Sequence, residues 1–230
     1  MGACTTSPFF YFYIAVLLDK ENIISTDPAP DFPSAFPDAA FDIVALASSA
    51  GGLNALSHVL TSLPADFPAV IVVVQHLDPR HRSLMAEILN RRTALQVKQA
   101  EEGARLRPAT VFIAPPNRHL LVNPDGTLSL SQSELVHFVR PSADLLFESV
   151  AASYKDRAIA VVLTGSGSDG NMGVQAIKKM GGTVIVQDEK TSEFFGMPSA
   201  AIHTGIVDFI LPLDEIAASL VMLVVKGEAE

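Results

Sequence analysis

The segment Phe41–Leu60, "FDIVALASSAGGLNALSHVL", combines a strand, a glycine turn and a helix. The continuous apolar run Ile43–Ala47 predicts a strand that is buried on both faces. Beyond the turn, leucine and valine side chains recur on one face of a helix. The turn itself suits one of two chemistries: bare backbone amides bind a phosphate, or an exposed serine hydroxyl attacks a carbonyl carbon.

The same alternation of strand and helix continues along the chain. Apolar, β-branched runs predict four more strands, at Ala69–Val74, Val111–Ala114, Ala158–Leu163 and Thr183–Gln187. Amphipathic patterns predict helices around Leu84–Leu89 and over Ala143–Tyr154, Met172–Met180 and Asp214–Val225. The segment "HLLVNPDGTLSL", His119–Leu130, predicts a hairpin. We therefore expect an α/β fold: a doubly wound, mostly parallel sheet with one antiparallel hairpin, in a Rossmann-like three-layer architecture.

The composition is typical of a globular protein with a large core. Hydrophobic residues make up 49% of the 230 residues, and charged residues only 18%. The formal net charge of −9 argues against a nucleic-acid binder, which would carry a basic face. A single cysteine, Cys4, excludes an internal disulfide and a thiolate metal cluster, and no HxH or HExxH spacing suggests a metal site. We expect neither a metal nor an organic cofactor.

Residues 1–40 are expected to form an N-terminal extension and linker, and residues 41–227 a folded catalytic domain. Four prolines fall within Asp27–Ala40, a composition typical of a linker. The apolar run Phe9–Leu18 is too short to span a bilayer, and no basic residue precedes it as in a signal peptide. We therefore expect no stable membrane insertion and a cytoplasmic location, which the single cysteine also fits.

Three polar residues with catalytic potential follow three of the predicted strands. Ser49 follows the first strand, His76 lies in "QHLDP" after the second, and Asp169 lies in "TGSGSDG" after the fourth. Because the carboxyl ends of parallel strands meet at one edge of a sheet, all three are expected on one rim. Serine, histidine and aspartate together are the members of a nucleophilic triad.

Each of these residues also has a plainer interpretation. Ser49 is placed to cap a helix, His76 to be a satisfied histidine at a strand end, and Asp169 to cap the helix that follows it. Their joint occurrence on one rim favours the triad. The other five histidines lack such a placement: His58, His81, His119, His137 and His203.

A nucleotide-binding module is the alternative interpretation. Gly165, Gly167 and Gly170 form a GxGxxG pattern between a strand and a helix, and Asp188 follows the next strand as a ribose-binding acid would. However, Asp169 would place a carboxylate where the pyrophosphate must lie. Like charges about 4 Å apart repel by roughly 4 kcal/mol near a protein surface.

Six longer segments of the sequence carry further information about its family. The segments "ALASSAGGLNAL", "VVVQHLDP", "EEGARLRPATVFIAPPNRHLLV", "RPSADLLFESVA", "VVLTGSGSDGNMGVQAIKKMGG" and "FGMPSAAI" cover most of the chain from Phe41 to about Leu223. In them the sequence resembles the CheB-type catalytic domain of the chemotaxis protein-glutamate methylesterases. The resemblance implies a nucleophile, a base and an orienting carboxylate at Ser49, His76 and Asp169. It also implies an oxyanion hole from the amides of Ala50 and Ser166, and a turn for substrate approach at Gly51 and Gly52.

The implied activity is hydrolysis of glutamate γ-methyl esters on the cytoplasmic helices of methylated chemoreceptors, with glutamine deamidation by the same chemistry. The family often has threonine where Ala50 stands and methionine where Ser166 stands, but backbone donors survive a change of side chain. Forty-eight residues precede Ser49, which is too few for the family's receiver domain, so any control of activity is expected from a separate regulatory partner or from substrate availability. A family member that binds receptors without turnover is a further alternative, disfavoured by the intact triad.

Overall fold

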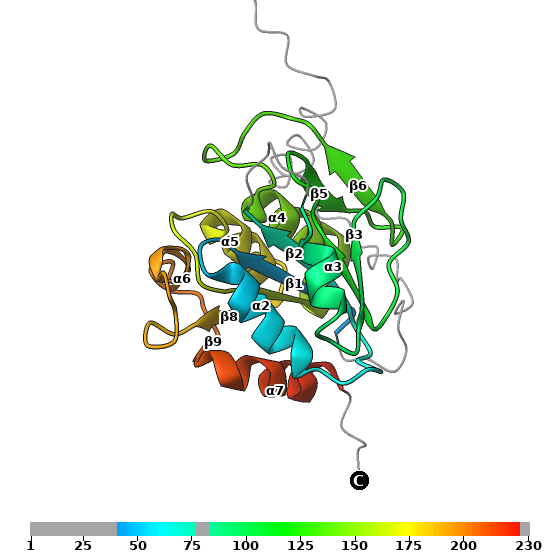
Figure 1. Cartoon of the computed structure of the whole chain (residues 1–230). Coiled ribbons are helices and arrows are strands. Elements are labelled where there is room, and N and C mark those ends of the chain that lie inside the picture. Colours follow the sequence, from blue (N-terminus) through cyan, green and yellow to red (C-terminus); the bar gives the residue numbers. More distant parts are fainter. Residues whose placement is uncertain (1–40, 77–82, 226–230) are drawn as a thin grey trace, which may run out of the picture. The chain divides into compact units, whose positions relative to one another are not determined.

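A seven-stranded, wholly parallel sheet forms the centre of the fold, in the order β3-β4-β2-β1-β7-β8-β9 (Figure 1). Its strands are β1 (Ile43–Ser48), β2 (Val70–Gln75), β3 (Gln96–Gln99), β4 (Thr110–Ile113), β7 (Ala158–Val162), β8 (Thr183–Gln187) and β9 (Phe209–Leu211). This computed structural model describes residues 41–76 and 83–225, which belong to one unit of the chain. The predicted extension 1–40 and the last two residues of the predicted domain lie outside the described residues.

Helices cover both faces of the sheet. They are α2 (Gly52–Thr61), α3 (Met85–Asn90), α4 (Ala143–Tyr154), α5 (Asn171–Lys179), α6 (Gly196–Ile202) and α7 (Leu213–Val224), with a short 3-10 turn, η1 (Lys155–Arg157). The helices α2, α3 and α7 lie on one face, and α4 and α5 pack together on the other (Figure 1). Within the described ranges, no helix is long and apolar enough to cross a membrane.

A separate antiparallel pair lies beside the main sheet. It consists of β5 (His119–Val122) and β6 (Leu128–Ser131), and β5 packs against α4. This contact matters for the site, because it brings the first residue of β5 close to the beginning of α4.

The strand order switches direction at the central strand β1. Strand β2 pairs with one edge of β1 and is followed outward by β4 and β3. Strand β7 pairs with the other edge of β1 and is followed outward by β8 and β9. Ser48 at the end of β1 is level with Gln75 at the end of β2, and Ala47 is level with Val162 of β7. Ligands of open α/β sheets bind where the order of strands switches in this way. The segments that follow these three strands therefore meet at one point.

The predicted fold class is confirmed. The five predicted strands and the predicted hairpin are present, and the predicted helix Ala143–Tyr154 has the bounds of α4. Every residue of β1, β2 and β7 is buried, which explains their continuous apolar runs. The edge strands β3 and β9 and the short helix α6 were not predicted. Strand β3, with the sequence QVKQ, is largely exposed and lacks the apolar run of a central strand. Strand β9, with the sequence FIL, is apolar but only three residues long, which is too short to mark a strand by itself.

Candidate active site

The turn after β1 presents Ser49 at the rim of the sheet. The Ser49 amide donates to the Thr164 carbonyl at 3.0 Å, which ties this turn to the segment that follows β7. Gly51 has φ +76°, in the left-handed region that favours glycine, and the Gly52 amide donates to the Ser49 carbonyl at 2.9 Å. Helix α2 begins at Gly52, so Ser49 precedes the positive end of a helix.

Gln75 holds this turn in place. Its side-chain amide donates to the carbonyls of Ser49 and His76, at 2.7 and 2.9 Å, and its oxygen accepts from the Ser48 hydroxyl at 2.6 Å. A Cβ atom on Gly52 would lie only 1.9 Å from the Gln75 Oε1 atom. Internal packing therefore already requires glycine at position 52, and a role of Gly51 and Gly52 in substrate approach stays a prediction.

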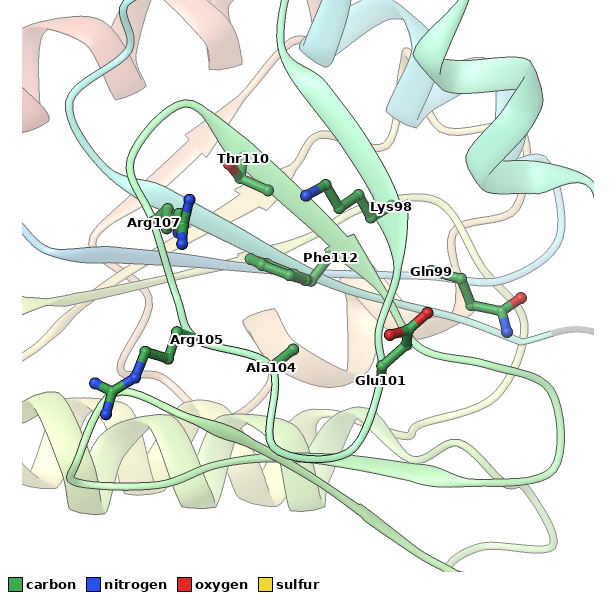
Figure 2. Close-up of a pocket in the computed structure, with 8 residues that line it drawn as sticks. All are labelled: Lys98, Gln99, Glu101, Ala104, Arg105, Arg107, Thr110 and Phe112. Atoms are coloured by element: carbon green, nitrogen blue, oxygen red, sulfur yellow. The ribbon is translucent and has the colours of Figure 1, made fainter.

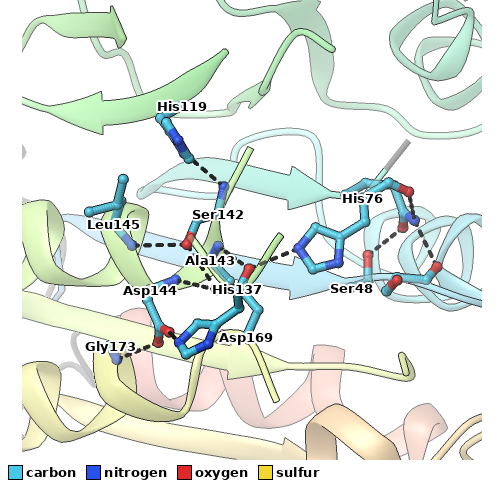
Figure 3. A network of polar contacts seen from close by, with 12 residues as sticks. Ser48, His76, His119, His137, Ser142, Ala143, Asp144, Leu145, Asp169 and Gly173 are labelled. Atoms are coloured by element: carbon cyan, nitrogen blue, oxygen red, sulfur yellow. Dashed lines mark hydrogen bonds and ion pairs between the residues drawn. The ribbon is translucent and has the colours of Figure 1, made fainter. Parts of the chain in front are cut away.

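His76 and Asp169 are joined by a hydrogen bond. The His76 Nε2 atom lies 2.8 Å from the Asp169 Oδ2 atom (Figure 3). A carboxylate oxygen only accepts, so Nε2 carries the proton and Nδ1 of the neutral ring is left with a lone pair. The Ser49 hydroxyl makes no hydrogen bond within residues 41–76 and 83–225, so the serine–histidine bond of a complete triad is not formed here. Catalytic hydrogen bonds are often long or unformed without substrate.

Asp169 lies in a cradle made by the first turn of α4. Its Oδ1 accepts from the Ser142 hydroxyl at 2.8 Å and from the Asp144 amide at 3.2 Å, and its Oδ2 accepts from the Ala143 amide at 2.6 Å (Figure 3). Asp169 therefore does not cap α5, the helix that follows it, whose N-cap residue is Gly170. It caps α4 instead, where the helix dipole favours a negative charge.

The cradle keeps Asp169 ionised although its side chain is only 4% exposed. Burial alone would raise its pKa, but the hydrogen bonds from His76, Ala143 and Ser142 outweigh that effect, and the pKa of Asp169 lies below its ordinary value. A stable negative charge beside His76 can orient the imidazole and stabilise its protonated form.

A second buried carboxylate, Asp144, mirrors this arrangement. It lies in the first turn of α4, and its Oδ1 accepts from the Gly173 amide of α5 at 2.8 Å. Its Oδ2 lies 3.3 Å from the His137 Nε2 atom and has no hydrogen-bond partner in the described part of the chain. Burial, followed by the nearby charge of Asp169, raises the pKa of Asp144. Each helix is thus capped by a carboxylate from the other's N-terminal region.

The two predicted oxyanion donors have free amides. Neither the Ala50 amide nor the Ser166 amide donates a hydrogen bond among the residues that the structure describes, whereas the amides of Ser49 and Gly165 are engaged. A Cβ atom on Gly165 would lie 2.9 Å from the Ser49 Cβ atom. The segment that carries Ser166 therefore passes directly beside the candidate nucleophile.

The geometry argues against the nucleotide-binding alternative. The GxGxxG turn leads into α5, whose first-turn amide of Gly173 is already taken by the Asp144 carboxylate. Asp188 is engaged locally, since its Oδ1 accepts from the amide and the hydroxyl of Thr191. Two buried carboxylates near this helix end would repel a pyrophosphate.

The described residues provide no candidate metal site. No group of three or more histidine, cysteine, aspartate or glutamate side chains there could hold a metal ion. A pocket of about 490 Å³ lies at the edge of the sheet over β3 and β4, lined by Lys98, Arg105, Arg107, Glu101 and Phe112 among others (Figure 2). None of the candidate catalytic residues lines it, so we assign it no part in the chemistry.

Sequence reasoning missed the residues that support the candidate triad. Gln75, Ser142 and His119 are not among the predicted site residues. The signal for Ser142 was its position just before a predicted helix, which is typical of an N-cap residue. Its hydroxyl does accept from the Leu145 amide, at 3.5 Å, while it also donates to Asp169.

Comparisons with known proteins point to one family. The family model described as CheB methylesterase matches residues 44–220. A Leptospira interrogans protein, provisionally named protein-glutamate methylesterase/protein-glutamine glutaminase, is 41% identical over 183 residues, covering 80% of this chain and 95% of the relative. A Moorella thermoacetica protein of the same name is 42% identical over 187 residues, which cover 80% of this chain but only 44% of the relative.

A solved structure supports the same relationship. The catalytic domain of the Thermotoga maritima CheB methylesterase superposes with a TM-score of 0.77 at 40% identity, covering 80% of this chain and 98% of that domain. The resemblance noted in the sequence is therefore confirmed, and the chain belongs to the CheB methylesterase family.

Proposed function

We propose that this chain hydrolyses γ-methyl esters of glutamate side chains on methylated chemoreceptors. The observation that carries the proposal is the His76–Asp169 hydrogen bond, held by α4 at the rim where the turn of Ser49 also lies. The names of the relatives support the substrate class. The substrate would be the cytoplasmic helices of the receptors, which places the reaction in the cytoplasm.

In the proposed first half-reaction, Ser49 Oγ attacks the ester carbonyl carbon while His76 Nδ1 takes the hydroxyl proton. Asp169 orients the ring through Nε2 and stabilises the imidazolium. The carbonyl oxygen becomes an oxyanion, and the free amides of Ala50 and Ser166 donate to it. The positive end of α2 lies behind this turn and favours the same negative charge.

The first half-reaction ends when His76 gives its proton to the leaving methoxide oxygen, so that methanol departs and Ser49 carries the acyl group. In the second half-reaction, water attacks the acyl-enzyme with His76 as base, and glutamate is released as Ser49 regains its proton. A glutamine side chain would follow the same path with ammonia as the leaving group, so we propose deamidase activity as well.

The decisive experiment measures methanol release from methylated receptor membranes by the wild type and Ser49→Ala. Loss of a serine nucleophile can lower turnover on the order of a millionfold. The Ser49 hydroxyl makes no hydrogen bond within the described ranges, so the variant should keep the wild-type melting temperature. Ser62→Ala, at the exposed end of α2, is the matched control. Near-normal methanol release by a folded Ser49→Ala variant contradicts the proposal.

A companion measurement addresses the nucleotide-binding alternative. A ligand that binds only the folded state raises the melting temperature. We expect no binding of NAD or ATP, so their addition should leave the melting temperature unchanged. A clear rise in melting temperature, together with absent methanol release, would favour the alternative.

A further inference from the structure

His119, the first residue of β5, is completely buried, and both of its ring nitrogens are hydrogen-bonded. The Nδ1 atom lies 3.1 Å from the Ser142 amide nitrogen, and Nε2 lies 3.0 Å from the Glu134 carbonyl oxygen. Figure 3 shows the ring lying next to Ser142, with the Asp169 cradle on the other side of that serine. None of the proposed chemistry uses this histidine.

The partners of His119 define its tautomer. The Ser142 amide can only donate, so Nδ1 must be the unprotonated acceptor. The Glu134 carbonyl can only accept, so Nε2 must carry the proton. Burial lowers the pKa of His119 and outweighs the hydrogen bond to Glu134, which would raise it. The ring is therefore neutral, with one fixed acceptor and one fixed donor.

The acceptor side of His119 leads directly to the candidate catalytic pair. His119 holds the Ser142 amide, and the Ser142 hydroxyl donates to Asp169 at 2.8 Å. The next residue, Ala143, donates its amide to the same carboxylate, which in turn accepts from His76. The place of the Ser142 backbone thus governs two of the donors that aim Asp169 at His76.

We propose that His119 is a positioning residue for the His76–Asp169 pair, acting through Ser142; as a statement about catalysis this rests on the proposed function. Its Nδ1 lone pair fixes the first turn of α4 so that the Asp169 carboxylate is directed at the imidazole. If His119 had only a structural role, its important atom would be Nε2, which donates to the Glu134 carbonyl and holds that segment in place. The two nitrogens therefore separate the two roles.

Two amide variants test each nitrogen in turn. In His119→Asn the Oδ1 atom is placed like Nδ1 and can accept from Ser142, whereas the donor to Glu134 is lost. In His119→Gln the Nε2 atom is placed like the histidine Nε2 and can donate to Glu134, whereas Ser142 loses its acceptor. Both variants remove the ring, so the loss of packing is broadly shared.

The expected result is a difference in kcat. Misplacing a catalytic group by about 1 Å can lower the rate on the order of 100-fold. We expect His119→Gln to show a fall of that size in kcat for methanol release with KM unchanged, and His119→Asn to retain kcat within about tenfold of the wild type. Equal loss in both variants, or a greater loss in His119→Asn, would overturn the positioning role.

A second readout is independent of esterase activity. The proton between His76 Nε2 and Asp169 Oδ2 should give a low-field proton NMR signal in the wild type and in His119→Asn, and a shifted or exchange-broadened signal in His119→Gln. If the wild type showed this signal but released no methanol, the proposed function would fail while the positioning claim stood. An unchanged signal in folded His119→Gln would refute the positioning claim alone.

The wild type also provides a test that needs no variant. With ¹⁵N-labelled histidine, His119 should show a protonated Nε2 and an unprotonated Nδ1 at neutral pH. A protonated Nδ1 would contradict the proposal even if both variants failed to fold.

Discussion

Neutralising the two buried carboxylates, Asp169 and Asp144, should change the stability of the domain in opposite directions. The two side chains differ little in exposure, at 4% and 2%, but they differ in their partners. Asp169 accepts hydrogen bonds with both oxygens, whereas one oxygen of Asp144 has no hydrogen-bond partner in the part of the chain that is described. We expect Asp169→Asn to be destabilising and Asp144→Asn to be stabilising at neutral pH.

The loss of stability in Asp169→Asn follows from the groups that donate hydrogen bonds to the Asp169 carboxylate. The asparagine oxygen can keep the bonds to Ala143 and His76, but its amide nitrogen then faces Ser142 and the Asp144 amide. The serine hydroxyl can rotate and accept, but the backbone amide cannot. Losing the charge and leaving one buried donor unsatisfied should cost about 2–4 kcal/mol. For a domain of this size the melting temperature should fall by roughly 5–15 °C.

The gain from Asp144→Asn is smaller. The asparagine oxygen can still accept from the Gly173 amide, and the unsatisfied charged oxygen is replaced by an uncharged amide nitrogen that can donate to the His137 Nε2 atom 3.3 Å away. Removing an unsatisfied charged atom should stabilise by ~1–3 kcal/mol, and losing the favourable charge in the first turn of α4 should offset ~0.3–1 kcal/mol of that. A net gain of about 1 kcal/mol would raise the melting temperature by roughly 2–4 °C.

The two pKa shifts determine how each carboxylate's contribution to stability changes with pH. The lowered pKa of Asp169 means that its stabilisation is present above the ordinary aspartate value and is lost as the pH falls through the folded-state pKa. The raised pKa of Asp144 means that its contribution is present in acid and is lost as the pH rises through the folded-state pKa. Both variants should therefore melt like the wild type in acid and diverge in opposite directions toward neutral pH.

Thermal melts followed by circular dichroism between about pH 3 and pH 8 measure these differences. Asp66→Asn, which replaces an exposed carboxylate, is the matched control and should melt like the wild type throughout. If Asp169→Asn kept the wild-type melting temperature at neutral pH, or if Asp144→Asn fell by as much as Asp169→Asn, the assignment of these hydrogen bonds would be refuted.

Three further predictions follow from other contacts. Gly52→Ala should lower stability by about 1–3 kcal/mol and reduce methanol release, because the new methyl group would displace Gln75 from the turn; a wild-type melt would contradict this. Burial, with smaller contributions from nearby carboxylates, raises the pKa of Tyr154 to about 12, so Tyr154→Phe should remove the tyrosine phase at highest pH in an ultraviolet titration. Arg157→Lys should lower stability by about 1–2 kcal/mol, since lysine cannot reproduce the two 2.6 Å bonds from Arg157 to Asp42; an unchanged denaturant midpoint would argue otherwise.

The central part of the fold was predictable because burial on both faces leaves a strong pattern. The strands β1, β2 and β7 contain no exposed residue, and their sequences are apolar without interruption up to the buried polar residues Ser48 and Gln75 that end β1 and β2. The edge strand β9 escaped prediction because it is only three residues long, so its apolar run is too short to mark a strand, and its pairing with β8 comes from tertiary contact.

The candidate site was predictable only in part. Ser49, His76 and Asp169 follow predicted strands, so the parallel topology alone brings them to one rim. The supporting residues Ser142 and His119 belong to a helix start and to the hairpin outside the main sheet. Their meeting depends on how β5 packs against α4, a contact that local periodicity does not reveal.

The reciprocal caps of α4 and α5 bear on how relatives of this protein can be interpreted. Asp169 ties together two helices, so a descendant that had lost all turnover would still be under selection to keep it for folding. The Ser49 hydroxyl has no such bond among the described residues, and nothing in the packing would preserve it once chemistry ceased. Among such relatives, a serine at the position of Ser49 therefore indicates catalytic activity, whereas an aspartate at the position of Asp169 indicates only that the fold is retained.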